Sequence, residues 1–152
     1  MRLFVFLLLL FSTQLFSTLL SAKSQYGDVQ INSIASIYDA DTFRVNIDNW
    51  PAVVGQSVPV RVRGIDAPEI RGKCAFEKDL AQQARLLTVS LLNSAEVVEL
   101  RNIERGKYFR LLADVYIDGE NLAEQLIAQQ LSRPYDGGKR LTWCQAITLI
   151  AE

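Results

Sequence analysis

Residues 58–69 have the sequence VPVRVRGIDAPE. In the first half of this stretch every second residue is valine, which is the period of a β-strand with one buried face. The valines would enter a core, so Arg61 would point to the open face of the strand. A glycine and a proline then bracket a turn that carries Asp66 and Glu69. The stretch therefore predicts a strand and a following loop that present a cation and two carboxylates together.

Strand-like segments stand on both sides of a long helical segment. Alternating or β-branched residues predict strands at residues 29–37, 42–47, 58–64, 97–100 and 111–117. Residues 74–93 predict a helix, and its apolar stripe would be formed by Phe76, Leu80, Ala84, Leu87 and Leu91. Asn121 would cap a second helix that runs to about Gln130, and residues 141–152 are a candidate final helix. Five strands with a helix between the third and fourth predict an α+β fold: a five-stranded OB-fold β-barrel with helices packed on it.

The N-terminal segment differs from the rest of the chain. Residues 3–20 are strongly apolar after a short basic start, and the chain turns polar at Lys23. This pattern predicts a signal peptide over residues 1–22 and a single domain over residues 23–152. An uncleaved anchor is the alternative, because the apolar run approaches membrane-spanning length. On the first interpretation the mature protein is secreted or periplasmic and has no membrane contact after cleavage.

The charge balance and the absence of histidine limit the possible functions. The chain holds 16 basic and 17 acidic residues and no histidine. Without residues 1–22, which contain one arginine and no acid, the net charge falls from −1 to −2. The overall charge thus gives no support for tight non-specific binding to DNA, so any such binding would rest on local basic groups. Without histidine, Ser-His and Cys-His nucleophiles are excluded, and a general base would be a carboxylate, or less favourably lysine or tyrosine.

Two cysteines, Cys74 and Cys144, complete the composition. In an exported protein an even number of cysteines favours a disulfide, and two unpaired buried thiols are the alternative. A loop of this length would contribute roughly 4 kcal/mol of stability in the chain-entropy model.

Two acidic turns are candidates for a metal site. Asp39 and Asp41 lie in one turn, and Asp66 lies in the next acidic turn. For Asp39 alone, a local turn role is the simpler interpretation. Asp41 and Asp66 lie at the ends of predicted strands, where a barrel can bring two turns together. Two carboxylates and a backbone carbonyl are suitable ligands for a hard cation such as Ca²⁺.

Arg61 and Arg110 are candidates for binding an anion. A guanidinium group can bond two oxygens of a phosphate at once, which lysine cannot do. Hydrolysis of a phosphodiester adds negative charge to the phosphorus oxygens, and fixed cations stabilise that charge. Solvated surface positions are the ordinary alternative for both arginines.

Three motifs in order give the sequence a resemblance to a known family. The motifs are Asp-Ala-Asp-Thr at residues 39–42, the arginine strand with Asp-Ala-Pro-Glu at residues 61–69, and Lys-Tyr-Phe-Arg at residues 107–110. A turn at Asp118-Gly119 and a helical segment from Asn121 to Leu131 follow these motifs. From about Ile34 to Tyr135 the chain resembles the staphylococcal (micrococcal) nuclease family. The resemblance implies an OB-fold barrel and a calcium-dependent endonuclease that hydrolyses DNA and RNA and leaves 3′-phosphate ends.

The resemblance also implies roles for residues. Calcium would be bound by Asp41, Asp66 and the backbone carbonyl of Ala67. Glu69 would be the general base for the attacking water. Asp41, Asp66 and Glu69 match the family motifs position by position, and Ala67, where threonine is common, keeps the backbone carbonyl.

The basic and aromatic residues of the motifs would bind the substrate. Arg61 and Arg110 would hold the scissile phosphate and stabilise its transition state. Lys107, Tyr108 and Tyr135 would contact the nucleotide. We expect a monomer without a stable protein partner.

Two departures from the family pattern affect this interpretation. Ala40 stands where the family has glycine, so it would be strained if its φ were positive. Phe109 replaces the glycine before the second arginine, next to the expected nucleotide pocket. A non-catalytic nucleic-acid-binding OB-fold module is the main alternative function, and an OB domain that binds a small ligand or a protein is a third.

Overall fold

The computed structural model describes residues 26–144. The predicted signal peptide and residues 145–152 of the predicted final helix lie outside the described residues. No helix within the described range is long and apolar enough to cross a membrane.

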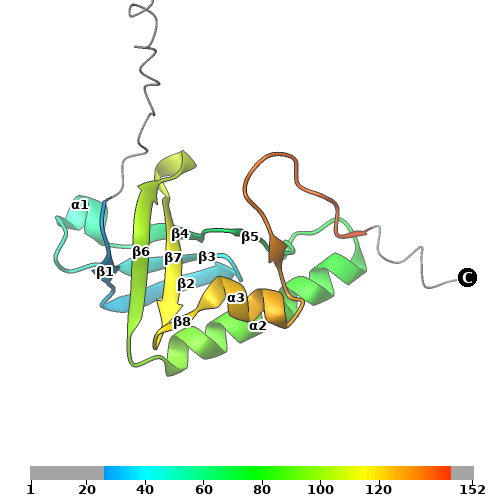
Figure 1. Cartoon of the computed structure of the whole chain (residues 1–152), viewed down its shortest axis with the longest axis horizontal. Helices are drawn as coiled ribbons and strands as arrows, with labels where there is room; N and C mark the ends of the chain where they lie inside the picture. The colour runs from blue at the N-terminus through cyan, green and yellow to red at the C-terminus, as the bar shows by residue number, and fades with distance from the viewer. Residues whose placement is uncertain (1–25, 145–152) are drawn as a thin grey trace, which may run out of the picture.

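A mixed, curled sheet organises the fold. Its strands are β1 (Val29–Gln30), β2 (Ser33–Asp39), β3 (Thr42–Asn46), β4 (Val58–Val62), β6 (Val98–Arg105), β7 (Leu111–Ile117) and β8 (Glu120–Asn121). They are ordered β1-β6-β7-β4-β3-β2, with β8 beside β7, and only the β4–β7 pair is parallel. Figure 1 shows β6 and β7 crossing the direction of β2, β3 and β4, so the sheet curls on itself. The predicted OB-fold class with packed helices is confirmed, and the helices are described below.

A second, two-stranded sheet lies at one end of this barrel. Its strands β5 (Ile65–Asp66) and β9 (Arg133–Pro134) pair antiparallel, with Asp66 opposite Arg133. This short sheet brings the end of the described chain next to the acidic turn after β4.

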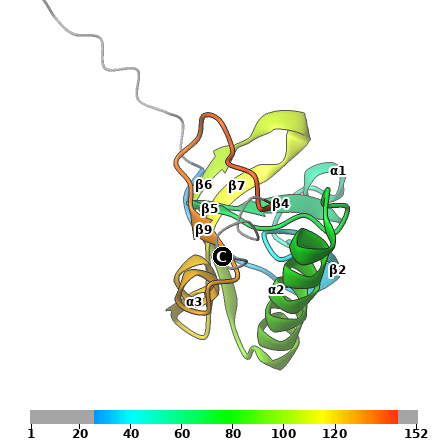
Figure 2. The ribbon, with the colours of Figure 1, turned by 90° about the vertical axis from the view of Figure 1, so that its right-hand side faces the viewer.

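The helices are α1 (Ala52–Gly55), α2 (Ala75–Ser94) and α3 (Leu122–Ala128), with a 3₁₀ turn η1 (Lys107–Phe109). Figure 2 shows α2 and α3 beside each other on one side of the sheet. Asn121 caps α3 as predicted, because its side chain accepts hydrogen bonds from the backbone N–H groups of Ala123 and Glu124.

The core is formed by the alternating residues of the strands. Val58, Val60 and Val62 are buried as the sequence predicts, and they pack with residues such as Val45 and Leu100 of other strands. The burial of this face positions the charged ends of β4 and β5 at the rim of the barrel.

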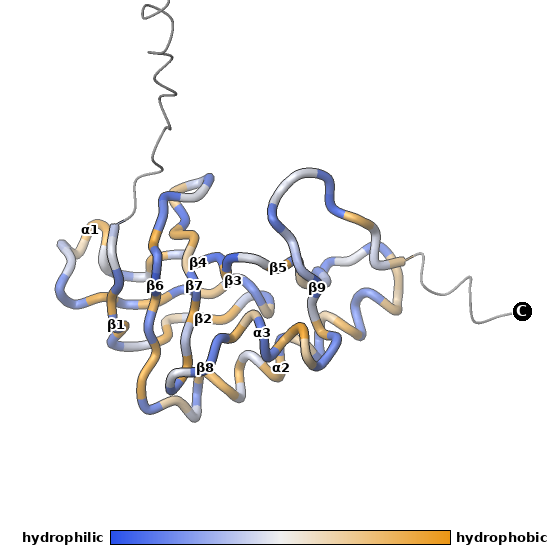
Figure 3. The backbone as a smooth tube through the Cα atoms, in the orientation of Figure 1, coloured by the Kyte–Doolittle hydropathy of each residue, from blue (hydrophilic) through white to orange (hydrophobic). Residues whose placement is uncertain are grey.

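The predicted stripe of α2 is partly wrong. The side chains buried most deeply are Ala81, Ala84 and Thr88, whereas Phe76 remains 39% exposed. Figure 3 shows hydrophobic and hydrophilic residues alternating along this helix. Small residues let the helix approach the sheet closely, and the Thr88 hydroxyl donates a hydrogen bond to the carbonyl of Ala40 at 3.0 Å. The face of α2 that packs on the sheet is therefore the one with small side chains, which fit closely, and not the one with the largest apolar side chains.

The predicted disulfide is confirmed. Cys74, directly before α2, is bonded to Cys144, and their Cα atoms lie 5.9 Å apart. The bond attaches residues 135–144, which we call the C-terminal strap, to the start of α2.

Removal of the disulfide is expected to destabilise the protein. A Cys74→Ser/Cys144→Ser variant should lose up to about 4 kcal/mol of unfolding free energy, because the cross-link spans 70 positions. Denaturant titration measures this loss. The wild-type protein in reductant is the control and should unfold at the midpoint of the double variant. Equal stability of the variant and the oxidised wild type would contradict a stabilising role.

Candidate active site

The two predicted acidic turns lie side by side at the rim of the barrel. The backbone N–H of Val62 donates to the carbonyl of Asp41 at 2.9 Å, and the N–H of Ala67 donates to the Asp41 carboxylate at 3.1 Å. The turn between β2 and β3 is thereby joined to the loop that follows β4. Chain segments 26 residues apart thus form one acidic corner.

Asp41 is the most constrained carboxylate of this corner. Its side chain is nearly inaccessible, and one of its oxygens accepts from Arg61 at 2.7 Å and from the Thr42 hydroxyl at 3.0 Å. Burial raises the pKa of Asp41, and the Arg61 charge opposes this effect. Arg61 also donates to the carbonyl of Ile65 at 3.2 Å, so its guanidinium is tied to both turns.

Asp39 belongs to the same corner, which the local-turn interpretation missed. Its side chain is buried, and burial together with the charge of Glu69 raises the pKa of Asp39 to about 6. The Glu69 charge also contributes to the raised pKa of Asp41. Three carboxylates therefore share one region of negative potential. The sequence signal was present, since Asp39 and Asp41 share one turn.

Asp66 is held by two arginines that the sequence analysis did not select. Arg133, its cross-strand neighbour, places Nε and Nη2 at 3.0 and 2.7 Å from one carboxylate oxygen. Arg140 of the C-terminal strap lies 3.2 Å from the other oxygen. The same Arg140 donates to Glu69 at 2.7 Å and so bridges two predicted site carboxylates. Neither arginine lies in one of the three motifs, although residues 133–140 carry three cations.

The carboxylates are neighbours but do not close around one point. Within residues 26–144, the one group of three potential metal ligands with donor atoms within 4.8 Å is Cys74, Glu77 and Cys144. Its cysteines are oxidised to a disulfide, which removes their thiolates as ligands. In the acidic corner, the guanidinium of Arg140 lies between Asp66 and Glu69 instead.

Glu77 fixes the loop that carries Glu69. Its buried carboxylate accepts from the backbone N–H of Lys73 at 2.9 Å and from that of Glu69 at 3.5 Å. Gly72 leaves room for this side chain, because a Cβ there would lie 2.5 Å from Glu77 carbon atoms. Glu77 lies in the helix that the sequence predicts over residues 74–93, but no motif indicated this role.

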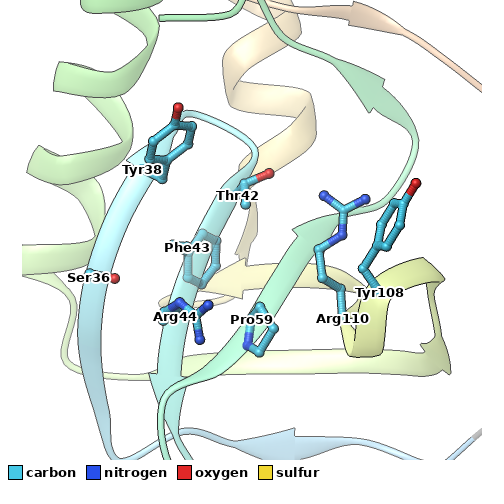
Figure 4. A pocket seen from close by; sticks show the side chains of 8 residues that line it. All are labelled: Ser36, Tyr38, Thr42, Phe43, Arg44, Pro59, Tyr108 and Arg110. Atoms are coloured by element: carbon cyan, nitrogen blue, oxygen red, sulfur yellow. The ribbon is translucent and has the colours of Figure 1, made fainter.

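A pocket of about 390 Å³ adjoins the acidic corner at Thr42 (Figure 4). It is lined by Ser36, Tyr38, Thr42, Phe43, Arg44, Pro59, Tyr108 and Arg110. The Arg110 guanidinium lies 5.9 Å from the Tyr108 ring, and the two side chains stand next to each other in the figure. Within the described part of the chain, the Arg110 side chain makes no ion pair or hydrogen bond. This cation is therefore available to an anion in the pocket.

The remaining predicted residues lie at different places. Ala67 is buried, and its backbone N–H donates to the Asp41 carboxylate. Lys107 is exposed on the same turn as Tyr108. Tyr135 does not line the pocket of Arg110; its hydroxyl donates to the carbonyl of Gly138 at 2.8 Å within the strap, and its ring lies 5.9 Å from Arg140. Ala40 has no positive φ, so the anticipated strain does not arise there.

The family of the chain follows from comparison with known sequences. The profile of the family described as staphylococcal nuclease homologue matches residues 59–140, which is more than half of the chain. The chain belongs to this family. The matched region includes Arg61, Asp66, Glu69 and Arg110, whereas Asp41 lies before it. A search of curated proteins finds no match.

The raised pKa of Asp39 predicts a pH dependence of stability in the presence of chelator. Asp39 binds its proton more tightly when folded (about 6, against 3.8), so unfolding free energy should fall as the pH rises from about 4 to 7. Asp39→Asn should remove this fall with pH and should raise the unfolding free energy at pH 7 by roughly 1–3 kcal/mol. Denaturant titrations at several pH values measure it. At pH 3.5 both proteins should be nearly equal in stability, and an unchanged slope in the variant would contradict the assignment.

Proposed function

We propose that the protein is a secreted or periplasmic, calcium-dependent nuclease that hydrolyses phosphodiester bonds of DNA and RNA and leaves 3′-phosphate ends. The observation that carries the proposal is the contact between a buried acidic corner and a pocket with an available arginine. Family membership supports the nuclease class. The disulfide supports export, because such bonds persist in oxidising compartments.

The donor set fits a hard divalent cation. The donors would be the buried carboxylates of Asp41 and Asp66, which are paired with arginines, and the backbone carbonyl of Ala67. Burial is the main cause of the raised pKa values of Asp39 and Asp41, and the nearby Glu69 charge adds to it; a bound cation would offset the cost of both ionised groups. Bound calcium would supply positive charge that stabilises the phosphorane-like transition state.

The side chains of the site would have three further roles: phosphate binding, proton acceptance and charge stabilisation. Arg110 would bind the phosphate from the pocket side, because its guanidinium is not used by the described chain. Glu69 is 43% exposed, so water can reach it, and the Glu77 carboxylate orders its loop. Glu69 would accept the proton of the attacking water. Arg61, which is bonded to Asp41, would stabilise the charge from a fixed position.

Loss of Arg110 or of the Glu69 charge should greatly reduce hydrolysis. Arg110→Ala and Glu69→Gln should each lower kcat about 100-fold or more, because each group acts on charge or protons in the transition state. The assay is cleavage of DNA and RNA by the purified protein with calcium and then with chelator. Arg101→Ala is the matched control, since Arg101 pairs with Glu99 away from the site. Full activity in chelator would contradict the calcium requirement.

The same assay tests the alternative function. A non-catalytic nucleic-acid-binding module would bind oligonucleotides but would release no cleavage product. One observation favours this alternative: the carboxylates of Asp66 and Glu69 are both paired with arginines of the chain itself.

Arg140 should compete with a divalent cation for the acidic corner. Its positive charge lies 3.2 Å from Asp66 and 2.7 Å from Glu69, where it balances the charge that a cation would balance. Arg140→Gln should therefore tighten binding of Ca²⁺, or of Tb³⁺ as a luminescent probe, at least about fivefold.

Calorimetry and terbium luminescence measure the affinity without reference to activity. Lys139→Gln removes the same charge from the neighbouring, exposed position and is the control. Its affinity should change less than that of Arg140→Gln. Weaker metal binding by Arg140→Gln would show that Arg140 supports the metal site instead of competing for it.

A further inference from the structure

The tip between β6 and β7 holds two exposed aromatic residues in an unusual backbone conformation. Tyr108 and Phe109 have φ values of +57° and +63°, a region that glycine adopts easily and other residues rarely adopt. Hydrogen bonds close the turn, from the N–H of Gly106 to the carbonyl of Arg110 at 2.7 Å and from the N–H of Arg110 to the carbonyl of Lys107 at 3.2 Å.

No burial compensates for this strain. Tyr108 is 87% exposed and Phe109 is 73% exposed. Strained positions that bring no packing gain are found mainly at functional sites. Phe109 is also a departure from the family pattern, in which a glycine occupies this position. The exposed ring is therefore available to a ligand outside the folded chain.

Each of the two rings is paired with a different arginine. Arg110 lies 5.9 Å from the Tyr108 ring, and Arg105 lies 4.5 Å from the Phe109 ring. Arg105 also donates to the carbonyl of Phe109 at 3.4 Å. Residues 105–110 thus carry three cations and two aromatic rings and no acid. This composition suits a strand of nucleic acid, whose phosphates meet cations and whose bases stack on rings.

Phe109 faces a hollow of its own. This hollow of about 150 Å³ is lined by Trp50, Val53, Val54, Gln56, Ser57, Val58, Pro59, Arg105, Phe109 and Leu111. It meets the pocket of Tyr108 and Arg110 at Pro59, which lines both. None of the described residues that line it is acidic. Its small size and apolar wall suit one planar ring rather than a folded protein.

We propose that Phe109 and Arg105 form a second stacking site, for a base of single-stranded DNA or RNA that neighbours the nucleotide bound at Arg110. The proposal rests on the proposed function for the nature of the substrate. It adds a specificity-determining residue: Phe109 would favour oligonucleotides over mononucleotides, because only a longer strand reaches both hollows.

The test removes the ring while keeping the backbone conformation. Phe109→Gly and Phe109→Asn both tolerate a positive φ and both lack an aromatic ring. In a Glu69→Gln background with calcium, their Kd for a labelled single-stranded octanucleotide should rise about 5- to 100-fold, as expected for the loss of one stacked base. Their Kd for a nucleoside 3′,5′-bisphosphate should stay within about twofold of the parent value. Phe109→Trp, which keeps a ring, should bind the octanucleotide as tightly as the parent.

Thermal melting separates stacking from folding. The Gly and Asn variants should melt at or above the parent temperature, because the strain of Phe109 is relieved. Unchanged octanucleotide affinity in both variants would overturn the second site, and so would an equal loss for both ligands. Neither result would affect hydrolysis by the wild type. Ring-dependent binding by a wild-type protein that cleaves nothing would support the stacking site and refute the proposed hydrolysis.

Discussion

The structure depends on the buried carboxylate of Asp41. It accepts from Arg61 on one oxygen and from the backbone of Ala67 on the other, so one side chain joins the β2–β3 turn, β4 and the loop after β5. A buried charge is costly unless it is paired and hydrogen-bonded, and here both conditions are met. The same bonds that hold the barrel rim together therefore orient the acidic corner. Removal of Arg61 would disturb the fold and the site at once, because an unpaired buried carboxylate would remain.

Negative charge in this corner exceeds what Arg61 can balance, and the end of the described chain supplies the rest. Arg133 reaches Asp66 because the β5–β9 register places the two residues opposite each other. Arg140 reaches Asp66 and Glu69 from the strap, which the disulfide attaches to the start of α2. The disulfide thus has a consequence beyond stability, since it limits how far the strap can move from the acids. The corner combines groups separated by about two thirds of the sequence.

Local patterns were sufficient to predict much of the fold. The alternating valines of β4, the cap at Asn121 and the cysteine pair each indicated their structural role correctly, because each depends on neighbouring residues or on composition. The buried face of α2 could not be predicted in this way, since Ala81 and Ala84 were selected by their fit against the sheet and not by their hydrophobicity. Arg140 was missed for a related reason. Its position depends on the C-terminal strap. The path of this strap is set by the disulfide to Cys74, which is distant in sequence, and by the pairing of the short strands β5 and β9.

The sequence presents Arg61 and Arg110 as equivalent candidates, and the structure distinguishes them. Arg61 is only 13% exposed and its guanidinium is already bonded to Asp41 and to the carbonyl of Ile65. Its charge is paired inside the protein, so a phosphate bound there would share this guanidinium with Asp41 and the carbonyl of Ile65. Arg110 stands on a strained turn beside an open pocket, and its guanidinium lies 5.9 Å from the Tyr108 ring. A guanidinium in that state loses little on binding a phosphate, because no internal bond has to be broken. The strained turn at Tyr108 and Phe109 therefore has two effects. It exposes both rings, and it keeps the neighbouring Arg110 apart from the acids.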